Sequence, residues 1–259
     1  MTRITIVVAV RNAERAIARC IQSILQQEGV SWRCVIRDDA STDLTEQAIR
    51  RAVKSDRRFV VSTADRREWP ATTRWRALEI ASALQGACSS DIVVLLDGDD
   101  YLAGPDSLVS IRDFQDSHQL LASHGTFCDG DGTTCTWSRD YTASTKAHGT
   151  FRQAEWVATH TRAFRLGLYE HLDERVYTYA GRPIRAATDF ALFVAVLELA
   201  GRRSMHCPTV TYVYDDRGGR AMAARRRQVQ QAWKERLALT PSFSSLSDAI
   251  CAAILLGHT

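Results

Sequence analysis

The stretch Leu95-Leu96-Asp97-Gly98-Asp99-Asp100 joins an apolar run to a dense group of carboxylates. The four apolar residues at 93–96 are typical of a strand that is buried on both faces. The glycine between the acids permits a tight turn and the close approach of a ligand. Carboxylate oxygens at this density suit Mg²⁺ or Mn²⁺, which usually keep bound waters and also hold a diphosphate. The stretch therefore predicts a buried strand that ends in a divalent-metal site, with an acidic surface turn as the alternative.

Strands and helices are predicted to alternate through the first hundred residues. Apolar and β-branched runs indicate strands, and apolar residues three and four positions apart indicate helices. The predicted strands cover 4–10, 32–37, 59–62 and 91–96. The predicted helices cover 17–25, a segment through about 53, and 73–85, with another that begins at Pro105. We expect Asn12 to cap the first helix, and Asp43 with Glu46 to form a capping box for the second.

This alternation predicts a parallel sheet with right-handed crossovers and helices on its faces. The second half of the chain is less regular. Its predicted elements are short antiparallel strands around a turn in 120–137, a loop at 142–150, a strand at 209–214, and helices at 189–200, 220–237 and 246–256. We expect one domain over residues 1–259, with 1–105 and 106–259 as its two halves.

The composition is that of an ordinary globular protein. Hydrophobic residues make up 45% of the chain, charged residues make up 24%, and the net charge is +3. No apolar run approaches the ~20 residues that span a bilayer. The seven cysteines include no C-x-x-C pair, which predicts reduced, buried thiols. These features favour a cytoplasmic protein, with peripheral contact to a membrane surface left open.

Polar residues follow each predicted parallel strand. Ligands of such sheets bind at the carboxyl ends of the strands, where Arg11, the pair Asp38-Asp39, the segment 63–67 and the acids of 97–100 would meet. Mutual repulsion among these carboxylates costs stability unless a cation offsets it. The alternative explanation of 38–43 is a helix start that is rich in capping residues.

These motifs, in this order, resemble inverting glycosyltransferases of family 2, which have the GT-A fold, and are closest to a viral and bacterial branch. The strong resemblance covers about residues 3–105, and its matching pieces are 6–12, 23–27, 38–43, Arg74 and 96–102. Weaker matches lie at 160–165, 187–190 and 212–214. The resemblance implies a Rossmann-like, mostly parallel twisted sheet flanked by helices, with an irregular helical C-terminal part. It also implies Mn²⁺ or Mg²⁺ as cofactor and a nucleotide-diphosphate sugar, of the UDP or GDP type, as donor.

The same resemblance implies roles for the donor-side residues. Val10, Arg11 and Gly98 would line the nucleotide sugar, Asp39 would contact the base, and Arg74 would support the nucleotide. Asp99 would hold the metal, and Asp97 would touch ribose or a metal-bound water. Asp38, Asp100 and His160 are further candidates. This chain departs from the family pattern at Val10-Arg11, Ala40 and Trp75, which puts the base and sugar specificity in doubt.

Asp189 is the candidate catalytic base for the acceptor hydroxyl. It would lie in the first turn of a helix capped by Thr188, where the helix dipole favours the ionised form that a base needs. Ordinary helix-start chemistry is the alternative explanation. The acceptor would be a glycan, a lipid-linked sugar or a small molecule. Trp137, Trp156 and Tyr179 are expected to pack in the core rather than stack on it.

Three other functions are weighed against this one. The run Arg225-Arg226-Arg227 would suit a polyanion, so the acceptor could instead be a modified nucleic-acid base. A sugar-phosphate nucleotidyltransferase would use a similar sheet, but the sequence after the first strand lacks the glycine-rich loop with lysine. A non-catalytic binding module would not depend on Asp99 or Asp189.

Overall fold

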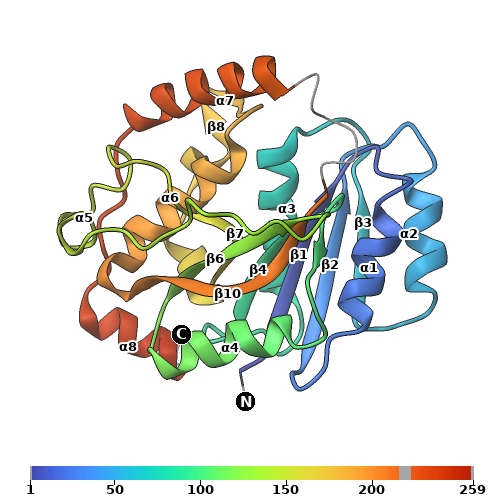
Figure 1. Cartoon of the computed structure of the whole chain (residues 1–259), viewed down its shortest axis with the longest axis horizontal. Helices are drawn as coiled ribbons and strands as arrows, with labels where there is room; N and C mark the ends of the chain where they lie inside the picture. The colour runs from blue at the N-terminus through green and yellow to red at the C-terminus, as the bar shows by residue number, and fades with distance from the viewer. Residues whose placement is uncertain (1, 216–222, 258–259) are drawn as a thin grey trace.

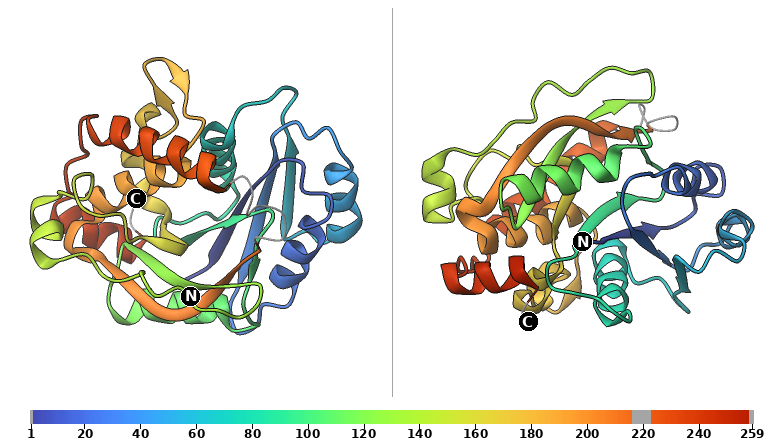
Figure 2. Two further views of the ribbon diagram at one scale, coloured as in Figure 1. Left: turned by 45° about the horizontal axis from the view of Figure 1, so that its top comes forward. Right: turned by 90° about the horizontal axis from the view of Figure 1, so that it is seen from below.

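The computed structural model describes residues 2–215 and 223–257. A single large sheet runs through the molecule, with helices on both of its faces (Figures 1 and 2). Its eight strands lie in the order β3-β2-β1-β4-β7-β6-β10-β5. A second sheet contains only β8 and β9.

The bounds of the elements follow chain order. The strands of the large sheet are β1 (Ile4–Val10), β2 (Trp32–Asp38), β3 (Phe59–Thr63), β4 (Ile92–Asp97), β5 (Tyr101–Leu102), β6 (Ala122–Asp129), β7 (Thr159–Arg165) and β10 (Ser204–Tyr214), and those of the small sheet are β8 (Thr178–Tyr179) and β9 (Arg182–Pro183). The α-helices are α1 (Ile17–Leu25), α2 (Thr45–Val53), α3 (Pro70–Ala83), α4 (Ser107–Ser117), α5 (Ala143–His148), α6 (Thr188–Ala200), α7 (Ala223–Ala238) and α8 (Asp248–Leu256).

The central strands divide their side chains between two cores. Successive residues of a strand point to opposite faces of its sheet. In β1, Val7 packs in one core with α3 and α6, while Ile6 and Val8 pack in the other with α1, α2 and α4. Burial on both faces explains why the β1 sequence is a continuous apolar run rather than an alternating one.

The strand pairing brings several carboxyl ends together. β1 pairs in parallel with β2 and β4, and β2 pairs in parallel with β3. In this register Val10 lies beside Asp38, and Ala9 lies beside Asp97. β7 runs antiparallel to both β4 and β6. The expected mostly parallel α/β sheet flanked by helices is therefore confirmed.

Two predicted helix caps are wrong. Helix α1 begins at Ile17 with no side-chain cap, and the Asn12 side chain accepts a hydrogen bond from the Thr42 amide instead (2.9 Å). Asp43 accepts from the Thr45 amide at 3.0 Å, but Glu46 pairs with Arg50 at 2.7 Å and closes no capping box. Asn12 therefore ties the loop after β1 to the loop after β2.

The second half of the chain departs further from expectation. Residues 143–148 form helix α5 rather than a loop. The segment 120–137 contains one long strand, β6, and an isolated bridge between Cys128 and Thr134 across a tight turn. Strand β7 was not predicted, because its sequence is polar and short of β-branched apolar residues. The predicted helix from 220 is present as α7, and residues 220–222 lie outside the described part of the chain.

All seven cysteines are free thiols, and four of them are buried as predicted, whereas Cys88, Cys128 and Cys135 are only half-buried. No helix in the described part of the chain combines the length and the apolar character needed to cross a membrane.

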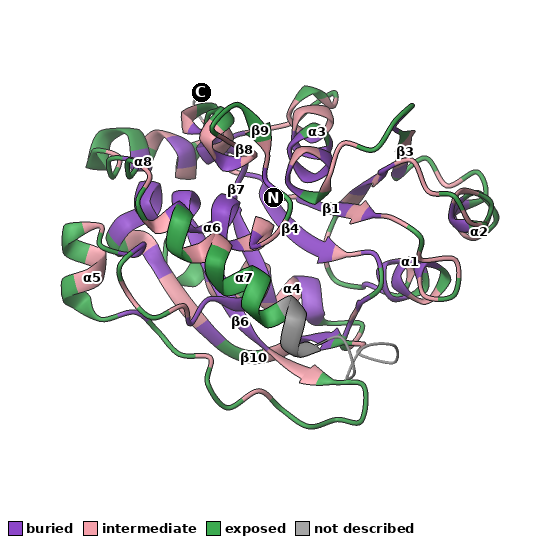
Figure 3. Ribbon diagram, turned by 90° about the horizontal axis from the view of Figure 1, so that it is seen from above, coloured by how far each residue is buried: buried purple, intermediate pink, exposed green. Residues whose placement is uncertain are grey.

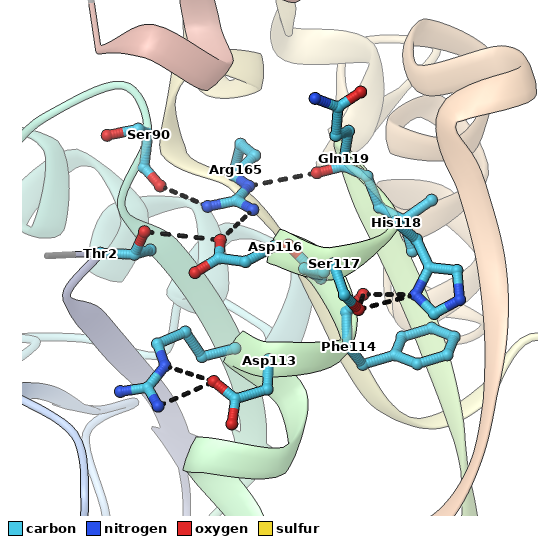
Figure 4. Close-up of polar contacts among 12 residues, drawn as sticks. Thr2, Ser90, Asp113, Phe114, Asp116, Ser117, His118, Gln119 and Arg165 are labelled. Carbon is cyan, nitrogen blue, oxygen red and sulfur yellow. Dashed lines mark hydrogen bonds and ion pairs between the residues drawn. The ribbon is translucent and has the colours of Figure 1, made fainter.

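A buried arginine joins the end of β7 to the first half of the chain. Arg165 is 2% exposed, and its guanidinium donates to the carbonyl oxygens of Leu120 (3.1 Å) and Ser90 (2.8 Å). It also pairs with the Asp116 carboxylate at 2.7 Å (Figure 4). One side chain thus holds together β7, α4 and the loop before β4.

Replacement of Arg165 tests how much its buried contacts contribute to stability. Arg165→Met leaves two backbone carbonyls without their donor, so we expect the free energy of unfolding to fall by about 2–4 kcal/mol. Urea denaturation at constant m-value measures the loss. The matched control is Arg50→Gln, which breaks an exposed pair on α2 and should cost under about 0.5 kcal/mol. Equal losses for the two variants would contradict the assignment.

Candidate active site

The loop after β2 is fastened to the loop before α3 through Asp39. Its buried carboxylate accepts hydrogen bonds from the backbone amides of Trp69 (3.1 Å) and Glu68. Arg11 donates to the carbonyl oxygens of Asp39 and Ala40 from the end of β1. A carboxylate that accepts two amides still has lone pairs for a ligand donor. These contacts place Arg11 and Asp39 side by side at the carboxyl edge of the sheet.

Asp38 forms a turn. Its buried carboxylate accepts from the Ser41 amide (3.2 Å) and from the Ser41 hydroxyl. Burial raises the pKa of Asp38, and the Ser41 hydrogen bonds oppose that rise. Asp38 therefore holds the 38–41 turn in shape.

Gly98 allows the turn at residues 97–100, the acidic turn, to pack over the end of β1. A Cβ atom at position 98 would lie 2.6 Å from both Cβ and Cγ2 of Val10, closer than any real contact. The Gly98 amide also donates to the Ala9 carbonyl at 3.3 Å. The absence of a side chain is thus what allows the turn to pack on β1.

The three acids of the turn have different surroundings. Asp99 is exposed, and Asp97 is partly exposed with 32% of its side chain accessible. Asp100 is buried, accepting from the Tyr212 hydroxyl (2.5 Å) and the Asp215 amide (2.9 Å). Burial, with the charges of Asp97 and Asp99, raises the pKa of Asp100 to about 9, so this carboxyl is neutral at pH 7. Asp100 therefore fixes the turn to β10.

Arg74 connects the acidic turn to the start of α6. The buried guanidinium pairs with Asp97 at 2.6 Å and donates to the Thr188 hydroxyl at 3.3 Å. Burial raises the pKa of Asp97, but Arg74, His160 and Arg162 outweigh burial, so the pKa is lowered overall. Asp189 follows Thr188 directly. The Arg74 side chain therefore connects the predicted metal site at the acidic turn with the segment that carries the predicted base.

Asp189 lies in the first turn of α6, as predicted. The helix is not capped by Thr188, because it already begins there. The Asp189 carboxylate pairs with Arg162 on β7 at 2.8 Å. Burial raises its pKa, but Arg162 and His160 outweigh burial and lower the pKa to about 2. Asp189 is therefore ionised at neutral pH.

His160 lies on β7 two residues from Arg162. Its ring stacks on Tyr212 with 4.4 Å between centroids. Burial and the neighbouring Arg162 lower the pKa of His160 to about 3, so the ring is neutral at pH 7. Residues two positions apart on a strand point to the same face of the sheet, so a predicted strand here would have placed Arg162 beside His160. The sequence did not predict β7, and this neighbour was therefore missed.

Two cavities open beside these residues. One, of about 630 Å³, is lined by Asp99 together with Arg11, Arg19, Asp43 and Asp215. The other, of about 410 Å³, is lined by Asp189 and His160, with Trp137 and Trp156 among its aromatic walls. The expectation of core packing is wrong for Trp137, which is 47% exposed, and it is confirmed for Trp156, which packs against the core and also lines this cavity. Tyr179 does pack against the core.

The donor set at the acidic turn fits a weakly chelated hard cation. Within the described residues, no three His, Cys, Asp or Glu side chains gather as a metal cluster. Mg²⁺ and Mn²⁺ are commonly held by one or two carboxylates, with waters and phosphate oxygens as the remaining ligands. The accessible carboxylates of Asp97 and Asp99 are ligands of that kind.

The sequence profile of glycosyl transferase family 2 matches residues 5–176. The chain belongs to this family. An uncharacterized glycosyltransferase from Haemophilus influenzae is 32% identical over 134 residues, which are 51% of this chain and 50% of that protein. A teichoic acid poly(glycerol phosphate) polymerase from Staphylococcus epidermidis is 29% identical over 128 residues, 49% of this chain and 17% of that protein. These matches thus span about half, or less, of the relatives. Membership of a viral and bacterial branch stays a prediction.

Solved structures show the GT-A fold of the family. S. aureus TarS in complex with UDP-GlcNAc has a TM-score of 0.66 at 18% identity, covering 100% of this chain and 71% of that one. A mannosyltransferase from Pyrobaculum calidifontis in complex with GDP-Man and Mn²⁺ has a TM-score of 0.63 at 19% identity, covering 98% and 68%. This chain therefore has the GT-A fold, in agreement with its membership of glycosyl transferase family 2.

The contact between Gly98 and Val10 can be tested as a pair. Gly98→Ala places a methyl group inside Val10, so we expect the turn to shift and the affinity for UDP- or GDP-sugars with Mn²⁺ to fall at least about tenfold. Val10→Gly in the same chain removes the clashing atoms and should recover part of that loss. Calorimetric titration of the two single variants and the double variant measures the coupling. Strictly additive losses would mean that the two residues do not share this space.

Proposed function

We propose that the chain transfers a sugar, with inversion, from a UDP- or GDP-sugar to an acceptor hydroxyl, and that Asp189 is the general base. The observation that carries the proposal is the bridge made by Arg74, which touches Asp97 at 2.6 Å and Thr188 at 3.3 Å. Through it, the acidic turn and the candidate base belong to one site. Residues 1–105 would bind the donor, and residues 106–259 would bind the acceptor.

The donor half is assigned to the carboxyl edge of β1, β2 and β4. Val10, Arg11 and Gly98 would line the nucleotide sugar, Asp39 would accept from the base, and Arg74 would hold Asp97 in place. Asp99, with Asp97, would hold Mn²⁺ or Mg²⁺ on the diphosphate, and a bound metal neutralises charge on the leaving group. UDP-GlcNAc in the TarS structure, and GDP-Man with Mn²⁺ in the Pyrobaculum structure, support this assignment by analogy.

The acceptor half supplies the base. The Asp189 carboxylate would take the proton of the acceptor hydroxyl as that oxygen bonds to the anomeric carbon. The bond between this carbon and the diphosphate oxygen breaks on the opposite side, which inverts the configuration and releases the nucleoside diphosphate. Arg162 orients Asp189, and His160, neutral at pH 7, adds no charge beside it.

The other hypotheses carry less support. Family membership is that of a glycosyltransferase rather than a nucleotidyltransferase. The nucleic-acid acceptor was suggested by the basic run 225–227, of which the structure describes only the Arg227 side chain, in the wall of the smaller cavity. Family membership likewise favours an enzyme over a non-catalytic binding module.

Asp189→Asn tests the base. Because the amide cannot accept the proton, we expect turnover to fall by about 10²–10⁴-fold while donor affinity stays within about threefold. The matched control, Glu155→Gln, removes an exposed carboxylate of the same half and should change neither value. Equal loss of turnover and of donor affinity in Asp189→Asn would assign it a binding role instead.

Metal removal tests the donor site. Chelator should lower sugar-nucleotide turnover by about 100-fold or more, and Mn²⁺ or Mg²⁺ should restore it. Asp99→Asn should require a higher metal concentration for half-maximal rate, whereas Asp113→Asn, on the exposed side of α4, should not. Full activity in chelator would rule out the metal.

A further inference from the structure

The 410 Å³ cavity beside Asp189 combines an aromatic wall with a group of cations. The described residues of its wall carry four aromatic rings besides His160: Phe127, Trp137, Trp156 and Tyr214. They also carry three permanently or normally charged cations: Arg162, Arg227 and Lys234. Asp189 is the single carboxylate among these described lining residues. The wall therefore has a surplus of positive charge.

Two of the cations that line the cavity come from α7 and form no salt bridge within the described part of the chain. Arg162 pairs with Asp189, but neither Arg227 nor Lys234 lies within salt-bridge distance of a described carboxylate. Burial lowers the pKa of Lys234, and Asp189 partly offsets that effect. The Lys234 ammonium lies 5.8 Å from the Trp156 ring. A half-buried ammonium against an aromatic wall costs desolvation that an anionic ligand would offset.

Helix α7 presents these cations to the site. Arg227, Gln230 and Lys234 are spaced three and four positions apart and line the cavity from one face of the helix. The Gln230 side chain accepts from the Ala187 amide at 2.5 Å, immediately before α6 begins. Figure 3 shows α7 on the surface above α6, with most of its described residues exposed. Gln230 therefore fastens this face of α7 to the start of α6, the helix that carries Asp189.

We infer that the acceptor is a sugar or glycan that carries an anionic group, a phosphate or a carboxylate, close to the accepting hydroxyl. The aromatic wall stacks on the sugar ring, because an apolar sugar face packs well against an aromatic ring. Arg227 and Lys234 bind the anion, and the accepting hydroxyl faces Asp189. This inference rests on the proposed function, since it takes the cavity beside Asp189 as the acceptor site.

Three matched ligands test the anion. Methyl glucoside, methyl glucoside 6-phosphate and methyl glucuronide differ only at C6, which carries a neutral hydroxyl, carries a phosphate or is a carboxylate. Calorimetric titration of the full chain with UDP and Mn²⁺ present should give at least about tenfold tighter binding for one or both anionic ligands than for the neutral one. The preference should shrink in high salt. The stronger of the two anionic ligands identifies phosphate or carboxylate as the source.

Variants of α7 test the residues. Arg227→Gln and Lys234→Gln should each weaken binding of the preferred anionic ligand about tenfold, and of the neutral ligand less than about twofold. Lys234→Arg, which keeps the charge, should retain most of the preference. The matched control is Arg236→Gln on the same helix, because Arg236 contacts Trp233 outside the cavity and should leave the preference unchanged. Thermal unfolding of each variant confirms that α7 and the core are intact.

Equal binding of the three ligands, or binding of none, overturns the inference. Tighter binding of a short single-stranded oligonucleotide than of either anionic sugar also overturns it, in favour of a nucleic-acid acceptor. Failure of the proposed function gives a different result: sugar-nucleotide binding and slow donor hydrolysis, measured without any acceptor, would be absent. A chain that hydrolyses donor but shows no anion preference is a glycosyltransferase with a neutral acceptor.

Discussion

The arrangement of side chains at the carboxyl edge of β1, β2 and β4 depends on the close approach of Gly98 to Val10. Parallel pairing of β1 with β4 brings the two strand ends level, but a side chain at position 98 would hold the acidic turn away from β1. With the turn folded down, Asp97 reaches Arg74, while Asp100 reaches the end of β10. The positions of Asp97 and Asp100 therefore depend on the contact between Gly98 and Val10.

The three carboxyl groups of this turn have three different environments. Arg74 holds the pKa of Asp97 low, burial raises the pKa of Asp100 to about 9, and Asp99 is exposed beside the larger cavity. A dense acidic motif thus avoids most of its own repulsion. One carboxylate is paired, one is neutral, and one is left accessible to a cation.

Much of the fold could be predicted from the sequence because its signals are local. The apolar run of β1 and the helical spacing of α1 were predicted with the bounds that the structure has. Strand β7 was missed because polar side chains such as His160 and Arg162 serve the site rather than the core. The raised pKa of Asp100 could not be predicted either, since it comes first from burial, and burial depends on tertiary packing against segments such as β10, whose Tyr212 lies more than a hundred residues away. Helix α7 and Trp137 acquire their place at the cavity only through tertiary packing.

The shared guanidinium of Arg74 has a thermodynamic consequence. It is in contact with the acidic turn at one end and with the first residue of α6 at the other. In the proposed function, a donor that draws Asp97 away from Arg74 would also disturb the contact of Arg74 with the first residue of α6, the helix that carries Asp189. Linkage then requires reciprocity: the factor by which bound donor alters acceptor affinity equals the factor by which bound acceptor alters donor affinity. In the proposed function, donor and acceptor sites joined by one side chain would not be independent, and each would set part of the other's dissociation constant.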